Sequence, residues 1–331
     1  MRWTRRVFAT FLCLGIPVLL AQSPTPATTI HVPVRLVTAP TLVFSKEGRL
    51  IPGLQRADFR VLDNNRLQKV VLDTVSAPVS LALAVQVNRD VRQYVPFIAK
   101  AGAVFESVLI GESGQAAVIT YGDDVSMVKP MDAGDLQAAL AKLSANGRRA
   151  RMIDAGLRGV GLLQEGPSSR TRILVFVGQS MDDGSESTLT SLTEQADRGN
   201  VTIYALTLPE LGKAFVSDTF SLQGVSGAEL GGFGAGVDLG KLASVLSRSG
   251  KIESSTDPFS LLTAATGGTR LHFRKQSEFE NAIAIIGAEL RSAYLLSYYP
   301  SSRESGYHTI AIEVDVPGAK VYSRAGYWRA D

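Results

Sequence analysis

The stretch Val79-Ser80-Leu81-Ala82-Leu83-Ala84-Val85-Gln86-Val87 decides the fold class of this 331-residue chain. A nearly continuous apolar run of this length is typical of a strand that is buried on both faces of a sheet. A second run of the same kind spans residues 172–177, and apolar residues at helical spacing lie between the two. Strands that alternate with helices predict an α/β fold with a doubly wound, Rossmann-like sheet covered on both faces.

The same periodicities predict the other elements of this region. Helices are expected over residues 91–108, 135–143, 152–163, 189–198, 259–266 and 279–290. Further strands are expected over residues 115–121, 125–128, 201–206 and 269–273, the first two forming a hairpin around Gly122-Asp123-Asp124. We therefore expect an α/β domain over residues 78–291, interrupted by an irregular, glycine-rich insertion over residues 209–256.

Both flanks of this α/β region carry strand-like patterns. Before it, apolar residues alternate over residues 30–44 and 59–75, with turn residues at 46–48 and 63–65. After it, strands are expected over residues 294–299, 309–316 and 320–323. We expect residues 30–77 and 292–331 to form one small β-sandwich-like domain built from both ends of the chain, with the α/β domain inserted between them.

The first 22 residues predict a signal peptide for export. Three arginines precede an apolar run over residues 7–20, and a small residue, Ala21, ends it. The run is short for a membrane span and contains Pro17, and the general and twin-arginine export routes both remain open. Residues 23–29 are a polar, proline-rich spacer. We expect an exported protein, periplasmic or secreted, with no stable membrane span once the signal is cleaved.

Cleavage near Ala21 changes the overall composition of the chain. It removes Arg2, Arg5 and Arg6 together with Cys13, the only cysteine, and leaves 31 basic and 31 acidic residues. The remaining chain is neutral and free of thiols, which excludes a disulfide framework and a thiolate zinc site. The basic excess of the whole chain belongs to the signal and gives no support to a nucleic-acid partner.

Several motifs in a fixed order resemble a known family. Those in the α/β region are Pro78-Val79-Ser80-Leu81-Ala82-Leu83, Ala117-Val118-Ile119-Thr120-Tyr121 and Arg172-Ile173-Leu174-Val175-Phe176-Val177. Those in the flanks are Gly48–Leu54, Asp58-Phe59, Gln68-Lys69, Tyr294–Pro300 and Arg324–Tyr327. The order resembles a von Willebrand factor A (VWA) domain, and the flanks look like an exported bacterial VWA-related family common in acidobacteria.

This resemblance implies a divalent cation site, usually for Mg²⁺, at the top of the sheet. The family's ligands are an Asp-x-Ser-x-Ser motif after the first strand, a Thr on a later loop and an Asp after the fourth strand. The matching positions here are Gln86, Asn88, Asp90, Ala150 and Gln179. Because only Asp90 among them carries a charge, we expect a degenerate site without a metal, with Mg²⁺ or Ca²⁺ binding as the alternative.

The residues around this degenerate site predict an interaction surface. We expect it to contain Arg89, Asp90, Arg148, Arg149, Arg151 and Gln179. One hypothesis is that a guanidinium from the 148–151 loop takes the cation's place and pairs with Asp90, since its donor fork suits a carboxylate. The alternative is that these arginines are solvated loop residues.

We considered three functions for the chain. The preferred one is a non-enzymatic, metal-independent interaction module that binds an unidentified protein of the envelope or the extracellular space, with no catalytic residue and no cofactor. The second is a metal-dependent adhesion module that uses Asp90 with Asp182 or Asp183. The most remote is a serine hydrolase built on Ser180, for which His272 and His308 are the only downstream histidines.

Overall fold

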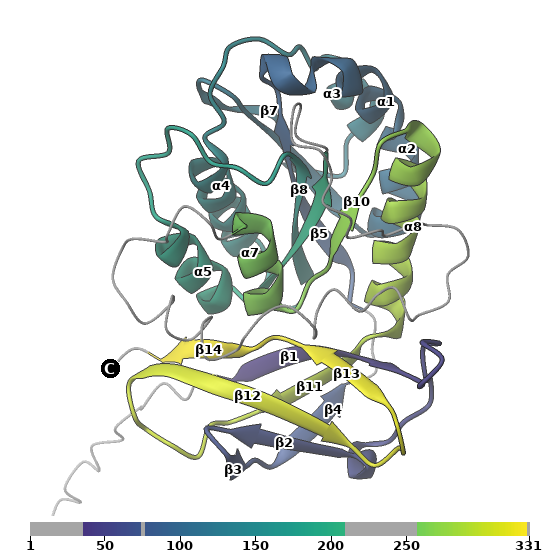
Figure 1. The fold of residues 1–331 in the computed structure, drawn as a ribbon, viewed down its shortest axis with the longest axis vertical. Helices are drawn as coiled ribbons and strands as arrows, with labels where there is room; N and C mark the ends of the chain where they lie inside the picture. The colour runs from purple at the N-terminus through teal and green to yellow at the C-terminus, as the bar shows by residue number, and fades with distance from the viewer. Residues whose placement is uncertain (1–35, 74–76, 209–256, 330–331) are drawn as a thin grey trace, which may run out of the picture. The chain divides into compact units, whose positions relative to one another are not determined.

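The computed structural model describes residues 36–73, 77–208 and 257–329. The expected signal peptide, the spacer and the 209–256 insertion lie outside these residues. A six-stranded sheet forms the centre of the α/β region (Figure 1). Its strands are β5 (Val79–Gln86), β6 (Gln115–Tyr121), β7 (Val125–Asp132), β8 (Thr171–Gly178), β9 (Val201–Thr207) and β10 (Arg270–His272).

The strand order confirms the doubly wound prediction. The order is β10-β9-β8-β5-β6-β7, parallel throughout except for β7, which pairs antiparallel with β6. Numbered by chain order within the sheet, this is 3-2-1-4-5-6 read from β7, in which the winding direction reverses between β5 and β8. Strands β5, β6, β8 and β9 are almost wholly buried, as their continuous apolar sequences require.

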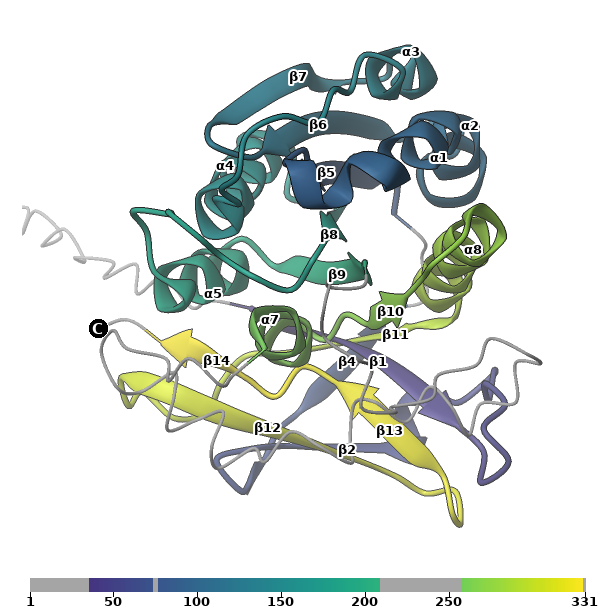
Figure 2. The ribbon, with the colours of Figure 1, turned by 45° about the horizontal axis from the view of Figure 1, so that its top comes forward.

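Helices cover both faces of this sheet (Figure 2). One face packs against α4 (Met152–Glu165), α5 (Leu189–Arg198) and α7 (Pro258–Thr266). The other packs against α1 (Val95–Lys100), α2 (Gly102–Phe105), α3 (Leu136–Leu140) and α8 (Gln276–Ser292). Small residues of β5 such as Ala82 and Ala84 face α4, and larger ones such as Leu81 and Leu83 face the second layer.

The prediction of one helix over residues 91–108 is wrong. This segment consists of the 3₁₀ turn η2 (Arg89–Tyr94), α1, α2 and the π-helical turn η3 (Glu106–Ile110). Pro96 lies in the first turn of α1, where its missing N–H costs no hydrogen bond, so the α-helix begins there. At Gly102 the backbone of α3 approaches so closely that a Cβ would collide with Gln137, which explains the second interruption.

Two four-stranded sheets form the expected β-sandwich. One has the order β13-β1-β11-β4 and the other β14-β12-β2-β3. The N-terminal flank provides β1 (Val37–Phe44), β2 (Phe59–Asp63), β3 (Arg66–Leu67) and β4 (Val70–Asp73), with the short η1 (Arg56–Asp58) before β2. The C-terminal flank provides β11 (Tyr294–Tyr298), β12 (Gly306–Val314), β13 (Lys320–Ser323) and β14 (Gly326–Arg329).

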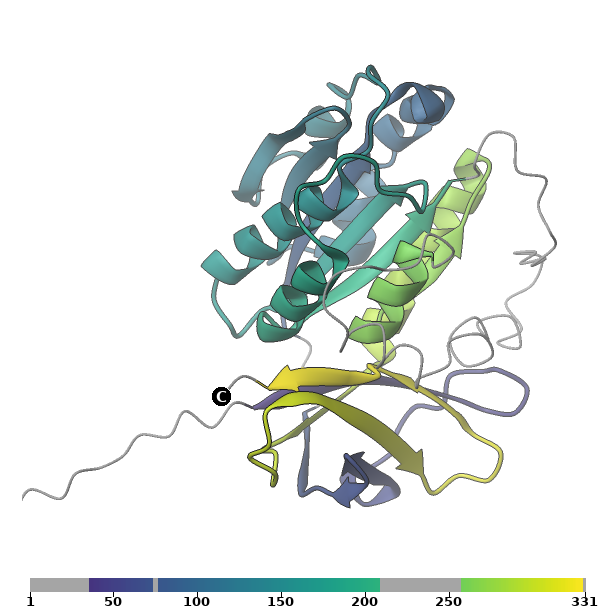
Figure 3. The same cartoon turned by 60° about the vertical axis from the view of Figure 1, so that its left-hand side comes forward.

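Both sheets combine strands from the two ends of the chain (Figure 3): these alternate in β13-β1-β11-β4, whereas in β14-β12-β2-β3 a C-terminal pair lies beside an N-terminal pair. β1 pairs antiparallel with β11 and β13, β4 with β11, and β2 with β12. Aromatic and branched side chains such as Phe59, Val61 and Tyr298 close the core between them. The pairing of the two flanks is therefore confirmed, while the domain boundaries at residues 78 and 291 stay predictions. In the described residues, no helix combines the length and apolar character that crossing a membrane requires.

Candidate functional site

Three buried amide side chains meet where the winding of the six-stranded sheet reverses. Gln86 ends β5, Asn88 follows it, and Gln179 follows β8, all at the carboxyl ends of neighbouring parallel strands. Each is at most 2% exposed. In open α/β sheets this position is where ligands bind, so the fold brings these residues to the place expected of a functional site.

The Gln86 carboxamide connects the other two amides, and we call these three side chains the amide cluster. Its Nε2 donates to Asn88 Oδ1 at 3.0 Å and to Gln179 Oε1 at 3.2 Å. Its Oε1 accepts from the Gln179 backbone N–H at 2.6 Å. One carboxamide group therefore satisfies two side-chain oxygens and one backbone N–H, which would each be costly to leave unpaired in a buried site.

Backbone groups fix the orientation of these amides. The Gln179 backbone N–H can only donate, so the Gln86 atom that it meets is the carbonyl oxygen and the other is the NH₂ group. Asn88 Oδ1 also accepts from the Asp90 backbone N–H at 3.2 Å, and Asn88 Nδ2 donates to the Arg148 carbonyl at 3.3 Å. These hydrogen bonds are mutually consistent. They place the Gln86 NH₂ group, rather than a free oxygen, at the centre of the amide cluster.

Gly178 and Tyr121 border the amide cluster. A Cβ at Gly178 would collide with the Tyr121 hydroxyl and with the Gln86 carboxamide, so only glycine fits there. The Tyr121 ring packs edge-on against Phe176 and is fully buried. Burial, together with the charge of Asp182, raises the pKa of the Tyr121 hydroxyl well above its usual value, so it is a neutral phenol at physiological pH.

Ala150 and Arg151 form contacts other than those considered in the sequence analysis, which placed them at a cation site beside Asp90. Ala150 is buried, and its backbone pairs with that of Asp183 in an isolated β-bridge. The Arg151 guanidinium bonds to Asp154 Oδ2 at 2.8 Å and to Glu186 at 3.0 Å. These carboxylates, with that of Asp154 the nearer, raise the pKa of Arg151.

The hypothesis that an arginine fills the cation site is therefore wrong for this structure. In the described part of the chain Asp90 forms no ion pair with any of the four arginines. The physical reason is local: Asp154, three residues after Arg151 and in the first turn of α4, binds the Arg151 guanidinium from the same loop.

Most residues of the predicted interaction surface are exposed, and their binding to a partner stays a prediction. Arg89, Asp90, Arg148 and Arg149 are exposed, and Arg151 is half-buried. Gln179 does not belong to this surface, because it is 2% exposed and hydrogen-bonded within the amide cluster. Its apolar neighbours in β8 and its bond to Gln86 hold it inside.

The Asp123 side chain holds the backbone of residues 148–151, which we call the arginine loop. Its Oδ1 accepts from the backbone N–H of Arg149 at 2.8 Å and of Arg148 at 2.9 Å. These two bonds, with the nearby charges of Arg149 and Arg89, lower the pKa of the Asp123 carboxyl. Because the backbone is held by Asp123, the Arg148 and Arg149 side chains project from a defined loop.

The donor set does not fit a divalent cation. The side-chain oxygens of Asn88 and Gln179 face an NH₂ group, and no carboxylate belongs to the amide cluster. Asp182 Oδ1 accepts from the Ile153 backbone N–H at the start of α4 and from Ser185 Oγ, so it serves as a helix cap. Over residues 36–73, 77–208 and 257–329, no three His, Cys, Asp or Glu side chains are grouped so that they could hold a metal.

Several solved structures are similar to this chain. A structure described as von Willebrand factor type A from Catenulispora acidiphila is 12% identical, with a TM-score of 0.44, and the match covers 90% of this chain and 64% of that one. The conserved hypothetical protein BatB from Bacteroides thetaiotaomicron is 9% identical over 64% of this chain and 98% of its own, with a TM-score of 0.40. The doubly wound six-stranded sheet, which the resemblance to a VWA domain implies, is observed directly in the α/β part of the chain.

A third similar structure is described with a bound metal ion. Proximal thread matrix protein 1 from the mussel byssus, described with a zinc-occupied MIDAS motif, is 11% identical over 68% of this chain and 49% of its own, with a TM-score of 0.43. No family model and no curated protein matches the sequence. This chain spans 64% of the length of the Catenulispora structure, and at these identities the comparisons describe the fold alone.

Ser180 in the α/β domain is held by an acid and not by a histidine. Its hydroxyl donates to Asp257 and accepts from the Phe259 backbone N–H at 3.1 Å. Asp257 caps α7 and pairs with Arg270. Ser180 thus serves to anchor the start of α7 beside β8, and no histidine contacts it in the described residues.

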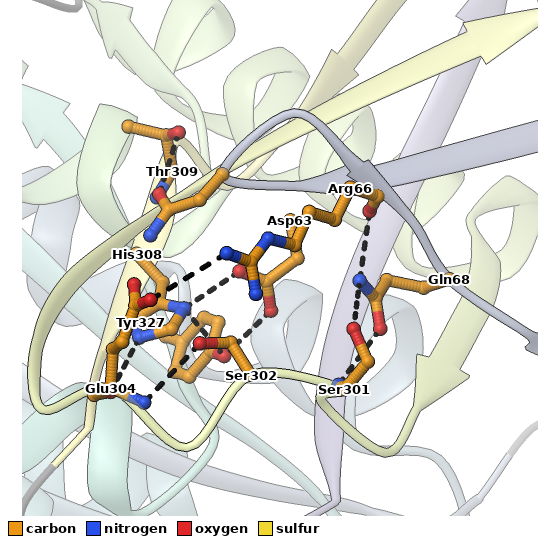
Figure 4. Close-up of polar contacts among 10 residues, drawn as sticks. Asp63, Arg66, Gln68, Ser301, Ser302, Glu304, His308, Thr309 and Tyr327 are labelled. Carbon is orange, nitrogen blue, oxygen red and sulfur yellow. Dashed lines mark hydrogen bonds and ion pairs between the residues drawn. The ribbon is translucent and has the colours of Figure 1, made fainter.

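A second buried polar cluster lies in the β-sandwich, and the sequence analysis did not identify it. His308 Nδ1 lies 2.7 Å from Asp63 Oδ1, His308 Nε2 lies 2.8 Å from the Glu304 carbonyl, and the Tyr327 hydroxyl donates to Asp63 Oδ2 at 2.7 Å (Figure 4). All three side chains are at most 2% exposed. The available signal was that Asp63 ends an apolar strand immediately before an Asn-Asn turn.

Proposed function

We propose that this chain is an exported, non-enzymatic module that binds a protein partner through the loop end of its VWA-like sheet, without a metal ion. The observation that carries this proposal is the position of the Gln86 NH₂ group between Asn88 Oδ1 and Gln179 Oε1. A cation at this place would have to displace two hydrogen bonds and would gain only neutral oxygens in return. Export rests on the expected signal over residues 1–22.

The charged loops above the amide cluster supply the binding surface. Arg89, Arg148 and Arg149 are exposed, and in the described residues their side chains form no ion pair. Exposed guanidinium groups on a fixed loop suit planar, hydrogen-bonded recognition of carboxylates and carbonyls. Asp90 next to Arg89, and Asp124 in the turn between β6 and β7, are also exposed and add acceptors, so the surface fits a polar protein partner with charges of both signs.

Absence of catalysis is part of the same proposal. The only carboxylate on the Ser180 hydroxyl in the described residues, that of Asp257, is already paired with Arg270 and caps α7, and no histidine contacts Ser180 or the amides there. The Asp63–His308 pair has the chemistry of a catalytic dyad, but its second ring nitrogen is bound to a backbone carbonyl and the pair is sealed in the β-sandwich core.

Capture of a partner from envelope material tests the proposal. We expect the chain to retain the same partner protein in Mg²⁺ and in excess EDTA, because no metal contributes to the surface. The double variant Arg148→Gln/Arg149→Gln should weaken retention about tenfold or more while leaving the melting temperature unchanged, since the loop is held by backbone bonds to Asp123.

The matched control is Arg56→Gln/Arg60→Gln, which removes two exposed arginines from the β-sandwich. Retention by this control should equal that of the unmodified chain. A partner that is lost in EDTA would contradict metal independence and support the metal-dependent alternative. Equal retention by both double variants would contradict the assignment of the arginine loop.

A further inference from the structure

The free edge of the β-sandwich at β4 has the features of a self-pairing surface. β4 ends the sheet β13-β1-β11-β4, and β11 is its only strand partner in the described residues. An edge strand presents unpaired backbone N–H and C=O groups to any chain that can align with it. We propose that two copies of this chain pair antiparallel through β4. The sheet β13-β1-β11-β4 of one copy would then continue into the same sheet of the other copy.

The side chains of this edge alternate as such a pairing requires. Val70 is buried and packs in the sandwich core, whereas Lys69, Val71 and Asp73 are exposed on the opposite face. Val71 is 60% exposed, although it is a β-branched apolar residue at the centre of the edge. Tyr299, which directly follows β11 next to the Tyr298–Val70 pair, is 61% exposed. Two of the exposed large hydrophobic side chains in the described residues therefore lie on β4 or at the end of its partner strand.

The charges of β4 are self-complementary about Val71. In an antiparallel pair centred on Val71, that residue faces its own copy, and Lys69 of each chain faces Asp73 of the other. All of these positions share one face of the strand, so the apolar contact is flanked on both sides by an ion pair. A two-fold axis through Val71 makes the interface isologous and closed, which limits assembly to a dimer.

The edge strand β7 of the six-stranded sheet is protected from pairing, in contrast to the four-residue strand β4. β7 ends the six-stranded sheet, and it carries Pro130, an inward-pointing Lys129 and two irregularities in its register with β6. Lys129 is 6% exposed and bonds to the Ala116 carbonyl at 2.7 Å. A proline, a buried charge and bulges are the devices that keep edges from pairing. β4 has none of these.

The test is the oligomeric state of the full chain by analytical ultracentrifugation over a wide range of concentration. We expect a monomer–dimer equilibrium. Val71→Lys should raise the dissociation constant at least about tenfold, because two like charges would meet at the axis. Leu67→Lys is the matched control: Leu67 is 65% exposed on β3, in the other sheet, and its substitution should leave the equilibrium unchanged.

A charge exchange tests the register itself. Lys69→Glu should weaken the dimer, and the double variant Lys69→Glu/Asp73→Lys should restore it. A chain that stays monomeric throughout the concentration range would overturn the proposal, as would a dimer that is indifferent to Val71→Lys. Failure of the double variant to restore the dimer would overturn the two-fold register. A monomer that instead captures an unrelated extended peptide at β4 would replace self-pairing with strand addition by another protein.

Discussion

The two buried polar clusters of this molecule differ in charge and in what they connect. The amide cluster of Gln86, Asn88 and Gln179 is neutral and lies next to exposed loops at the end of the six-stranded sheet. The cluster of Asp63, His308 and Tyr327 contains an ionisable pair and joins strands from both ends of the chain. Neutral groups thus hold the loop end of the six-stranded sheet in shape, while ionisable groups hold the β-sandwich together.

Removal of Asp63 should have the largest effect on stability. Asp63→Ala leaves the His308 Nδ1 position and the Tyr327 hydroxyl buried without their acceptor, so the free energy of unfolding should fall by about 3–5 kcal/mol. Denaturant unfolding measures this loss. Glu313→Ala is the control, since its ion pair with Arg60 is solvent-exposed and should contribute no more than about 1 kcal/mol. Equal effects of the two changes would contradict the distinction.

The buried carboxyl group of Glu289 should give the second-largest effect on stability, through its response to pH. Glu289 in α8 is 3% exposed and accepts from Thr269 Oγ1 at 2.7 Å. Burial raises the pKa of Glu289 to about 7. Because the unfolded chain ionises near the ordinary value of about 4.3, the folded chain holds an extra proton between the two values, and stability falls as pH rises through this window.

The expected loss between about pH 4 and pH 8 is about 3 kcal/mol from this residue. Glu289→Gln should therefore flatten the pH dependence of the unfolding free energy and stabilise the chain at pH 8. The partly exposed Glu280→Gln on the same helix should leave the pH dependence as it is. Parallel pH profiles for wild type and Glu289→Gln would exclude this explanation.

The amide cluster should give a smaller effect. Gln86→Leu keeps the size of the side chain but removes three buried hydrogen bonds, to Asn88 Oδ1, to Gln179 Oε1 and from the Gln179 backbone N–H, so we expect a loss of about 2 kcal/mol. Thermal unfolding compares it with Gln137→Leu, a glutamine on α3 outside the cluster that bonds to the Ala99 carbonyl. If Gln86→Leu proved more damaging than Asp63→Ala, the ranking of the two clusters would be wrong.

Ser180 should give the smallest response. Because its hydroxyl is bound by the Arg270-paired Asp257 and no histidine contacts it in the described residues, a fluorophosphonate should not label it. Mass spectrometry of the treated chain, with Ser180→Ala as the reference, checks this. Labelling that is specific to Ser180 would revive the hydrolase alternative.

Much of this fold could be predicted from the sequence, because strands buried on both faces must be almost wholly apolar. Residues 79–86 and 171–178 satisfy this rule, and their order with the helices gave the doubly wound sheet. The pairing of the chain's two ends was expected from their small size. The interruption of helix 91–108 was missed, because the close approach of α3 at Gly102 is a tertiary contact that periodicity does not carry.

For the candidate site, the sequence predicted where its residues lie in the fold but not which atoms they contact. The alignment of Gln86, Asn88 and Gln179 with family ligand positions located the cluster at the end of the sheet. Which donor met which acceptor depended on the three-dimensional positions of backbone groups such as the Gln179 N–H. The same limit explains the error on Arg151. In the sequence, Asp90 and Asp154 are both acidic residues that could pair with its guanidinium. Only the turn into α4 shows that Asp154 is the one within reach.

Calorimetric titration of the chain with Mg²⁺ and Ca²⁺ tests the central claim most directly. Gln86→Glu is the positive control, since it replaces the central NH₂ group with a carboxylate beside two further oxygens and should create a cation response. We predict no binding heat and no change in melting temperature for the unmodified chain, and metal-dependent stabilisation of Gln86→Glu by linkage. Saturable binding of either ion by the unmodified chain, abolished by Gln179→Leu, would contradict the account.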